Sequence, residues 1–284
     1  MAPAETVILT TSDGVAIAAD YWPGTPGTPG TTGTPGSGLA YVVGHGFTGS
    51  ARIPRVQRIS TQLAETGAAV LALDFRGHGR SGGRSTLGEL EVHDLAAAVA
   101  FLRAAGHRPI EGHGPVNGHG AVAVLGWSMG ASVVLRYAGR GGDVDAVVSI
   151  SSPGHWWERG TTPMRLVHWA VETRAGRLVT RVTTRTRLAG DGWAPLPESP
   201  VEVVAGIAPR PLLIVHGDAD RYFPVHHGRA LAAAAEGSAY WLEPGMGHAE
   251  AATTPELIAR IDGWVRSALN SPALDSTAAC RLRP

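Results

Sequence analysis

One stretch decides the fold of this chain: Ala121-Val-Ala-Val-Leu-Gly126-Trp-Ser128-Met-Gly130-Ala-Ser132. A short apolar run ends in a Gly-x-Ser-x-Gly pentad and passes at once into a helix-forming segment, which predicts a strand, a sharp turn and a helix. A serine on so tight a turn is strained, and its hydroxyl is lifted clear of the sheet as a candidate nucleophile. Side chains at Gly126 or Gly130 would crowd the neighbouring strand and helix, so both positions favour glycine.

The composition describes a globular protein without signs of a charged partner. Of 284 residues, 44% are hydrophobic and 17% charged, which allows a sizeable core, and 24 basic residues balance 24 acidic ones. This balance gives no indication of nucleic-acid binding. A single cysteine, Cys280, excludes a disulfide framework. With no signal-peptide pattern and no apolar run approaching about 20 residues, we expect a cytoplasmic protein that does not enter a membrane.

Strand and helix patterns alternate along most of the chain. We expect strands at 7–9, 15–22, 39–43, 69–73, 121–125, 144–150, 211–215 and 239–242, and helices at 55–67, 89–104, 131–139, 226–236 and 255–269. Such alternation predicts an α/β fold with a mostly parallel, eight-stranded sheet and helices on both faces. Residues 1–152 and 209–284 form this predicted core. The Pro/Gly/Thr-rich tract 23–38 is expected to be a flexible surface loop, because the hairpin before it is too short for a separate domain.

Two later strands end in side chains that suit a nucleophilic serine. The strand at 211–215 runs into a loop that contains Asp218 and Asp220, and the strand at 239–242 runs into a loop that contains His248. A nucleophilic serine needs a base within hydrogen-bond reach, and the base needs a carboxylate to fix its tautomer. Loops at the carboxyl ends of parallel strands meet at one edge of a sheet, where Ser128 also lies.

Several motifs together resemble those of the α/β-hydrolase superfamily, and the likeness covers roughly 39–151 and 208–269. They are His45-Gly-Phe47, Asp74-Phe-Arg-Gly-His-Gly-Arg-Ser81, the pentad Gly126 to Gly130, His216-Gly-Asp-Ala-Asp220, and Gly247-His248. The resemblance implies a serine hydrolase in which Ser128 is the nucleophile, His248 the general base and Asp220 the acid that orients it. It also implies an oxyanion hole formed by the backbone N–H groups of Phe47 and Met129.

Other candidates compete with these assignments. Asp218 is the alternative acid, although the motif spacing favours Asp220. Glu250, His226 and His227 are interpreted as surface residues, and His45 and His78 as histidines that hydrogen-bond backbone near the site. His107, His113 and His119 recur every six residues, but their glycine-rich loop offers no fixed ligand geometry, so we expect neither a metal nor a cofactor.

Residues 153–208 interrupt the alternation and are expected to form a cap over the site. A helix over 171–187 is predicted, with Val171, Ala175, Leu178, Val179 and Val182 on one face and four arginines (Arg174, Arg177, Arg181, Arg185) on another. The arginines fit a solvated face or, alternatively, an anion site for an acyl carrier. Trp127, Trp156, Trp157 and Met164 are candidates for an acyl pocket, or equally for packing of the cap onto the core.

The sequence therefore predicts a serine hydrolase that cleaves a carboxylic ester or thioester of small or medium acyl length through an acyl-enzyme. Acyl transfer, hydrolysis of C–C or peptide bonds, and perhydrolysis use the same three side chains and stay open. A hydrolase fold kept only as a ligand-binding protein is a further alternative. The expected partner is a small acyl ester, and nothing in the sequence requires more than a monomer or weak dimer.

Overall fold

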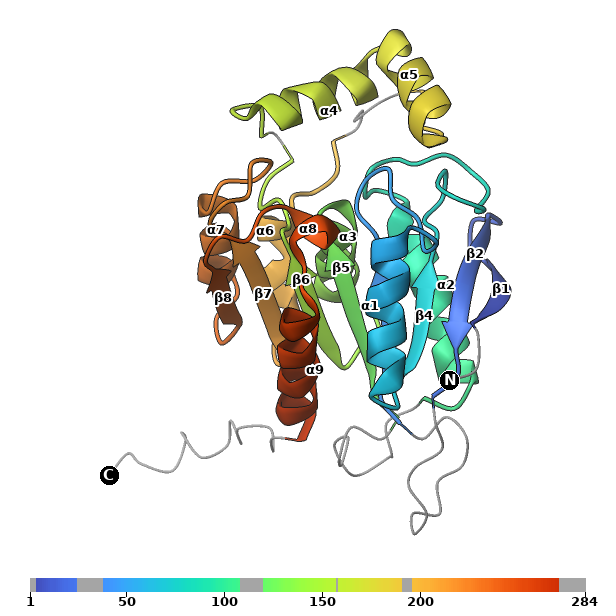
Figure 1. Cartoon of the computed structure of the whole chain (residues 1–284), viewed down its shortest axis with the longest axis vertical. Coiled ribbons are helices and arrows are strands. Elements are labelled where there is room, and N and C mark those ends of the chain that lie inside the picture. Colours follow the sequence, from blue (N-terminus) through green and yellow to red (C-terminus); the bar gives the residue numbers. More distant parts are fainter. Residues whose placement is uncertain (1–3, 25–37, 108–119, 157, 191–195, 271–284) are drawn as a thin grey trace.

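A computed structural model describes residues 4–24, 38–107, 120–156, 158–190 and 196–270 of the chain (Figure 1). Most of the predicted loop 23–38 lies outside these residues, and so do Trp157, His113, His119 and Cys280. What the sequence predicts for them stays a prediction. No helix within the described ranges has both the length and the apolar character needed to cross a membrane.

Eight strands form a single sheet in the order β1-β2-β4-β3-β5-β6-β7-β8. Strand β2 is antiparallel to both of its neighbours, and all other pairings are parallel. The predicted mostly parallel, eight-stranded sheet is confirmed. Its strands are β1 (Glu5–Thr10), β2 (Ala16–Trp22), β3 (Ala40–Gly44), β4 (Ala69–Leu73), β5 (Val122–Trp127), β6 (Ala146–Ile150), β7 (Leu212–Gly217) and β8 (Ala239–Glu243).

Helices cover both faces of the sheet (Figure 1). On one face lie α1 (Pro54–Glu65) and α9 (Pro255–Asn270), and on the other lie α2 (Glu91–Ala104), α3 (Met129–Gly139) and α7 (His226–Ala234). Side chains of a strand alternate between the two faces. Along β3, Ala40 and Val42 accordingly pack in the cluster with α2 and α3, while Tyr41 and Val43 pack with α1 and α9. The central strands are buried on both faces, which explains their continuous apolar sequences.

The segment from Asp74 to Ser81 fastens the loops at the carboxyl edge of the sheet. The Asp74 carboxylate accepts hydrogen bonds from the Ala51 N–H at 2.6 Å and from Nε of Arg80 at 2.9 Å. The Ser81 hydroxyl accepts the Ala18 N–H at 2.8 Å and so ties this segment to β2. These contacts give the Asp-x-Arg-Gly-x-Gly-x-Ser motif a structural role in holding the rim of the site.

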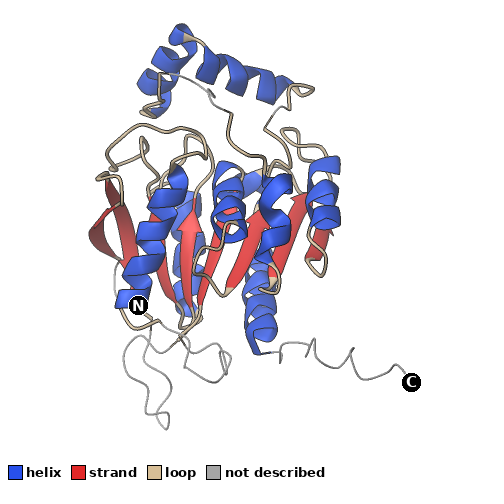
Figure 2. Ribbon diagram, turned by 180° about the vertical axis from the view of Figure 1, so that it is seen from behind, coloured by secondary structure: helices blue, strands red, loops and turns tan. Residues whose placement is uncertain are grey.

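Two helices, α4 (Thr162–Glu172) and α5 (Arg174–Thr184), stand over the carboxyl ends of the parallel strands (Figures 1 and 2). The helix predicted over 171–187 corresponds to α5, but its predicted bounds are wrong and α4 was not predicted: the chain is extended at Thr173 (φ −106°, ψ 147°), so α5 begins only after that residue. The Thr173 hydroxyl accepts the Gly176 N–H at 2.9 Å, which caps and starts the second helix. Two short elements, α6 (Pro200–Val203) and η2 (Val204–Ile207), then lead into β7.

The predicted apolar face of the second cap helix is also wrong. Leu178, Val179 and Val182 are exposed, whereas Gly176 and Thr180 are the buried positions of α5. A Cβ at Gly176 would meet the Trp169 carbonyl, so the helix approaches α4 through its small residues rather than its large ones. Of the four arginines predicted to share one face of this helix, three are exposed (Arg174, Arg181 and Arg185), as a solvated face requires.

Candidate active site

The turn between β5 and α3 holds Ser128 in a strained conformation. Its backbone has φ 53° and ψ −114°, a region that non-glycine residues seldom adopt. A Cβ at Gly126 would collide with the Gly130 carbonyl, and one at Gly130 would collide with the Gly44 carbonyl. The two glycines therefore allow β5, α3 and β3 to approach closely enough to support the turn, which presents the serine hydroxyl at the carboxyl edge of the sheet.

The structure brings Ser128, His248 and Asp220 together from the ends of three strands. His248 Nε2 lies 3.0 Å from Ser128 Oγ, and His248 Nδ1 lies 2.8 Å from Asp220 Oδ2. Because an ionised carboxylate can only accept, Nδ1 carries the ring hydrogen and Nε2 is free to accept the serine proton. This is the arrangement that a serine nucleophile with a general base requires.

Asp220 is buried, and its negative charge is stabilised by a full set of donors. Burial raises its pKa, but the hydrogen bond and charge of His248 and the backbone N–H groups of Phe223 and Tyr222 outweigh burial and leave the pKa below its ordinary value. The two N–H groups bind Oδ1 at 3.0 and 2.8 Å. Asp218, the competing acid, instead accepts the Gly245 N–H at 2.6 Å. Asp220 is thus the carboxylate that contacts the imidazole.

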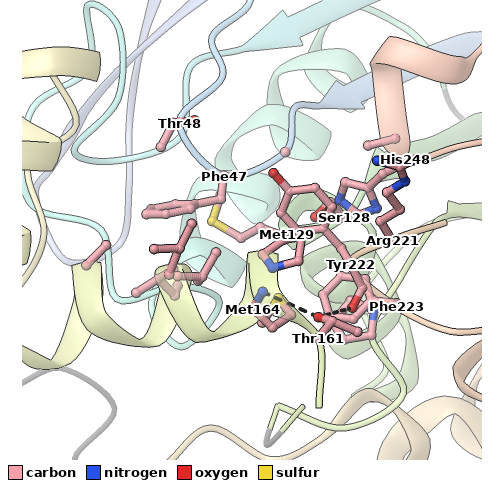
Figure 3. A pocket seen from close by; sticks show the side chains of 18 of the residues that line it. Phe47, Thr48, Ser128, Met129, Thr161, Met164, Arg221, Tyr222, Phe223 and His248 are labelled. Atoms are coloured by element: carbon pink, nitrogen blue, oxygen red, sulfur yellow. Dashed lines mark hydrogen bonds between the residues drawn. The ribbon is translucent and has the colours of Figure 1, made fainter. Parts of the chain in front are cut away.

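Two aromatic rings that sequence reasoning missed hold the imidazole in place. Tyr222 stacks on His248 with ring centroids 4.2 Å apart, and Phe223 meets it edge-on at 5.5 Å. They stand two and three residues after Asp220, so the loop that supplies the acid also restricts the rotation of the base (Figure 3). Their position just after a predicted acid is the sequence feature that could have identified them.

The orientation of the peptide between Gly46 and Phe47 is fixed by hydrogen bonds to its carbonyl oxygen. The Phe75 N–H donates to His45 Nε2 at 3.1 Å, so the ring hydrogen is on Nδ1, which donates to the Gly46 carbonyl at 2.7 Å. The Gly49 N–H donates to the same carbonyl at 3.0 Å. Burial lowers the pKa of His45 and keeps the ring neutral in this tautomer. The Phe47 N–H belongs to the same rigid peptide, so its direction is set by these contacts.

A cavity of about 880 Å³ opens above Ser128 and extends beneath the cap. Its lining is predominantly apolar and is shared between core and cap (Figure 3). Trp156 and Met164 line it as the sequence predicts, and so do residues that the sequence did not indicate: Leu87, Thr161, Leu166, Val167, Ala170, Thr180, Thr184, Arg221 and Glu250. The spacing of Met164, Val167 and Ala170 along one helix face was a usable signal.

Trp127 does not line this cavity, and its prediction as a pocket residue is wrong. It is fully buried, packs with the side chains of α1 and α9, and donates its indole N–H to Thr253 at 3.0 Å. The physical reason is the alternation of β5, which turns Trp127 toward the helices on one face of the sheet.

A family model for the alpha/beta hydrolase fold matches residues 42–170, which include the loop from His45 to Phe47, the Ser128 turn and most of α4. Together with the sheet order and the Ser128 turn, this match decides the family. The chain belongs to the α/β-hydrolase superfamily.

The known proteins that resemble this chain include a lipase, an esterase and a further α/β hydrolase. A monoacylglycerol lipase of Mycolicibacterium smegmatis is 29% identical over 267 residues, covering 80% of this chain and 88% of its own. An esterase of Pyrococcus furiosus, Pf2001, superposes with a TM-score of 0.69 at 21% identity, covering 94% of this chain and 91% of its own. The α/β hydrolase GrgF of Penicillium sp. sh18 gives a TM-score of 0.70 at 18% identity, covering 95% and 100%. The two structures share the fold, and the lipase supports ester hydrolysis by this α/β hydrolase.

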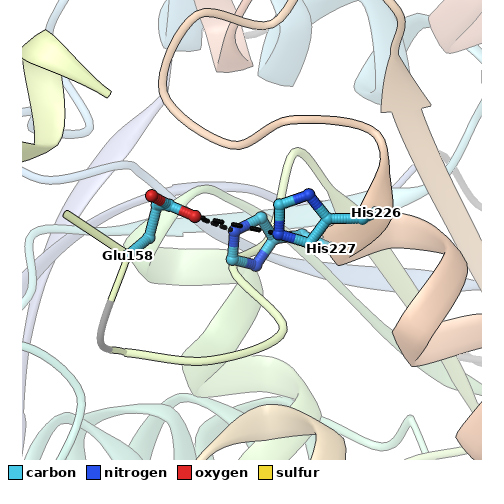
Figure 4. Close-up of side chains that lie close together, drawn as sticks. All are labelled: Glu158, His226 and His227. Carbon is cyan, nitrogen blue, oxygen red and sulfur yellow. Dashed lines mark hydrogen bonds and ion pairs between the residues drawn. The ribbon is translucent and has the colours of Figure 1, made fainter. Parts of the chain in front are cut away.

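A separate cluster joins Glu158 at the entry to the cap with His226 and His227 at the start of α7 (Figure 4). His227 is not the surface residue that the sequence predicts, since only 2% of its side chain is exposed. Its Nδ1 accepts the Gly154 N–H at 3.0 Å, so Nε2 carries the hydrogen and donates to Glu158 at 3.0 Å. A metal would need the lone pair of that Nε2. The contacts of this cluster therefore suit a histidine–glutamate pair that fastens the cap to α7.

Proposed function

We propose that this α/β hydrolase is a serine hydrolase that cleaves a carboxylic ester through an acyl-enzyme on Ser128. The observation that carries the proposal is the relay of two hydrogen bonds, 3.0 Å from Ser128 to His248 and 2.8 Å from His248 to Asp220, at the floor of an apolar cavity. Neither bond needs rearrangement before proton transfer can begin.

The proposed reaction begins when Ser128 Oγ attacks the ester carbonyl carbon while its proton passes to His248 Nε2. Asp220 stabilises the resulting imidazolium, and the N–H groups of Phe47 and Met129 receive the oxyanion. His248 then gives its proton to the departing alcohol, which leaves an acyl group on Ser128. A water molecule, deprotonated by the same imidazole, hydrolyses this acyl-enzyme and restores the serine.

The lining of the cavity supports an ester with one apolar acyl chain of medium length. The apolar side chains of Phe47, Leu87, Val167 and Met164 offer contact to such a chain. The similarity to a protein named as a monoacylglycerol lipase supports an ester substrate. The exposed cap arginines do not line the cavity and so cannot bind the phosphates of a substrate inside it. An acyl carrier that bears phosphates therefore suits the site less well than a simple ester.

The test combines active-site labelling with a panel of p-nitrophenyl acetate, butyrate, octanoate and palmitate, and butyryl-CoA. We expect fluorophosphonate labelling of the wild-type protein and the highest kcat/KM at butyrate or octanoate. Ser128→Ala should lower kcat by at least about 10⁴-fold and abolish labelling. Ser132→Ala, which removes a buried hydroxyl that donates to the Met129 carbonyl, is the matched control and should keep both turnover and labelling. A wild-type protein that neither turns over these esters nor takes the label contradicts the proposal.

A further inference from the structure

The Glu250 carboxylate lies beside the turn that holds Ser128. Glu250 follows His248 by two residues, at the start of α8 (Ala249–Ala252), and its Oε1 accepts the Gly46 N–H at 2.5 Å. A Cβ built on Gly46 would lie 3.2 Å from both carboxylate oxygens and 3.4 Å from Ser128 Cβ. Gly46 therefore lies between the Glu250 carboxylate and Ser128, and because it has no side chain both can approach it closely. The sequence-based interpretation of Glu250 as a surface charge is wrong.

The negative charge of Glu250 has little local compensation. The side chain is half-buried and lines the predominantly apolar cavity, and no cation of the described residues forms an ion pair with it. Arg221, which also lines the cavity, is exposed. A carboxylate offers about four acceptor positions, of which the Gly46 N–H occupies one. The remaining acceptor capacity is available to a ligand in the cavity.

Such a charge affects bound esters according to what they carry near the carbonyl. It attracts a cation, accepts a hydrogen bond from a hydroxyl group, and repels a second carboxylate. It also opposes the oxyanion that forms a short distance away, and a donor or positive charge on the substrate would offset that cost. Charge at this position thus distinguishes substrates of the same size and shape.

We propose that Glu250 is a specificity-determining residue, which favours esters with a hydroxyl or cationic group close to the scissile carbonyl and excludes esters with a carboxylate there. The inference rests on the proposed ester hydrolysis at Ser128 and adds to it the chemical class of the group next to the ester.

Pairs of esters that differ in charge test this directly. On the alcohol side, butyrylcholine is compared with its neutral isostere 3,3-dimethylbutyl butyrate. On the acyl side, monomethyl succinate is compared with dimethyl succinate. Hydrolysis is followed by proton release, and the ratio of kcat/KM values within each pair is the readout. Glu250→Gln keeps an oxygen that can accept the Gly46 N–H while removing the charge, and Glu236→Gln, an exposed glutamate outside the cavity, is the control.

The wild-type enzyme should prefer the cationic ester over its isostere and the diester over the monoester, and Glu250→Gln should reduce at least one preference by about tenfold. Glu236→Gln should leave both ratios unchanged. If both the wild type and Glu250→Gln are active and give the same kcat/KM ratios in both pairs, the inference is wrong, while the proposed function stands. If the wild-type protein cleaves neither these esters nor the p-nitrophenyl esters, both the inference and the proposed ester hydrolysis are wrong. If Glu250→Gln does not fold, the wild-type ratios are compared at 10 and 500 mM NaCl, where salt should weaken the preferences and unchanged ratios contradict the inference.

Discussion

The floor of the site and the cap above it differ in how firmly their residues are held. Ser128 is supported by glycines that admit no side chain, and Asp220 has donors on both oxygens. The cap helices instead contact the core through a small cluster in which Val171 and Leu188 meet Leu87. Five large apolar side chains of these helices are exposed: Leu166, Trp169, Leu178, Val179 and Val182. The residues proposed for the chemistry are thus closely packed and hydrogen-bonded, while the cap helices bury only a few apolar side chains against the core.

The largest effect should come from the acid that orients the base. Asp220→Asn replaces an acceptor of the His248 Nδ1–H with an amide that can favour the wrong tautomer, so kcat for p-nitrophenyl butyrate should fall by about 10⁴-fold. Asp218→Asn keeps an oxygen for the Gly245 N–H and should change kcat by less than about tenfold. If Asp218→Asn is the more damaging change, the proposed acid is wrong.

A second comparison tests how closely the turn at Ser128 is packed, by the same glycine-to-alanine change at a crowded and at an open position. In Gly126→Ala, the new methyl group meets the Gly130 carbonyl, and the free energy of unfolding should fall by about 3 kcal/mol. Gly263 lies inside α9 with open space around its Cβ position, so Gly263→Ala should raise that free energy by about 0.5–1 kcal/mol. Urea unfolding of the two variants gives both values. A Gly126→Ala variant as stable as the wild type would show that the turn can relax.

The order Ser128, Asp220, His248 could be predicted because each residue follows a strand, and parallel strands deliver their carboxyl ends to one edge. The cap could not be predicted in the same way. Hydrophobic periodicity assigns a buried face to large apolar side chains, but α5 packs through Gly176 and Thr180. Thr173 ends one helix and caps the next, but it stands between two helix-forming segments whose sequence pattern gives no sign of the break. Where packing rests on small residues, a pattern of large ones gives the wrong face.

Acid should weaken the core through its buried histidines. Burial, with a further contribution from His45, lowers the pKa of His78 to about 3 from an ordinary value of 6.5. The unfolded chain therefore takes up this proton as the pH falls below 6.5, whereas the folded chain does so only near pH 3. Within that window the free energy of unfolding should fall by up to about 1.4 kcal/mol per pH unit for this residue.

Urea unfolding at pH 7.5, 6.0 and 5.0 measures this dependence. His78→Gln should flatten it, because the titrating group is gone, while His226→Gln, at an exposed position, should not. A pH dependence that is the same in wild type and His78→Gln would mean that His78 binds its proton equally in both states.

The smallest effect concerns the same substitution at two positions of the cap. Val171 is 1% exposed and contacts Leu87 and Leu188, whereas Val179 is 46% exposed on α5. Val171→Ala should lower the free energy of unfolding by about 1–1.5 kcal/mol, because it removes two buried methyl groups. Val179→Ala should change it by less than about 0.5 kcal/mol, since water already covers that side chain. Equal losses at both positions would mean that the outer face of α5 is covered in solution, and the contrast between a firmly held floor and a lightly attached cap would then no longer hold.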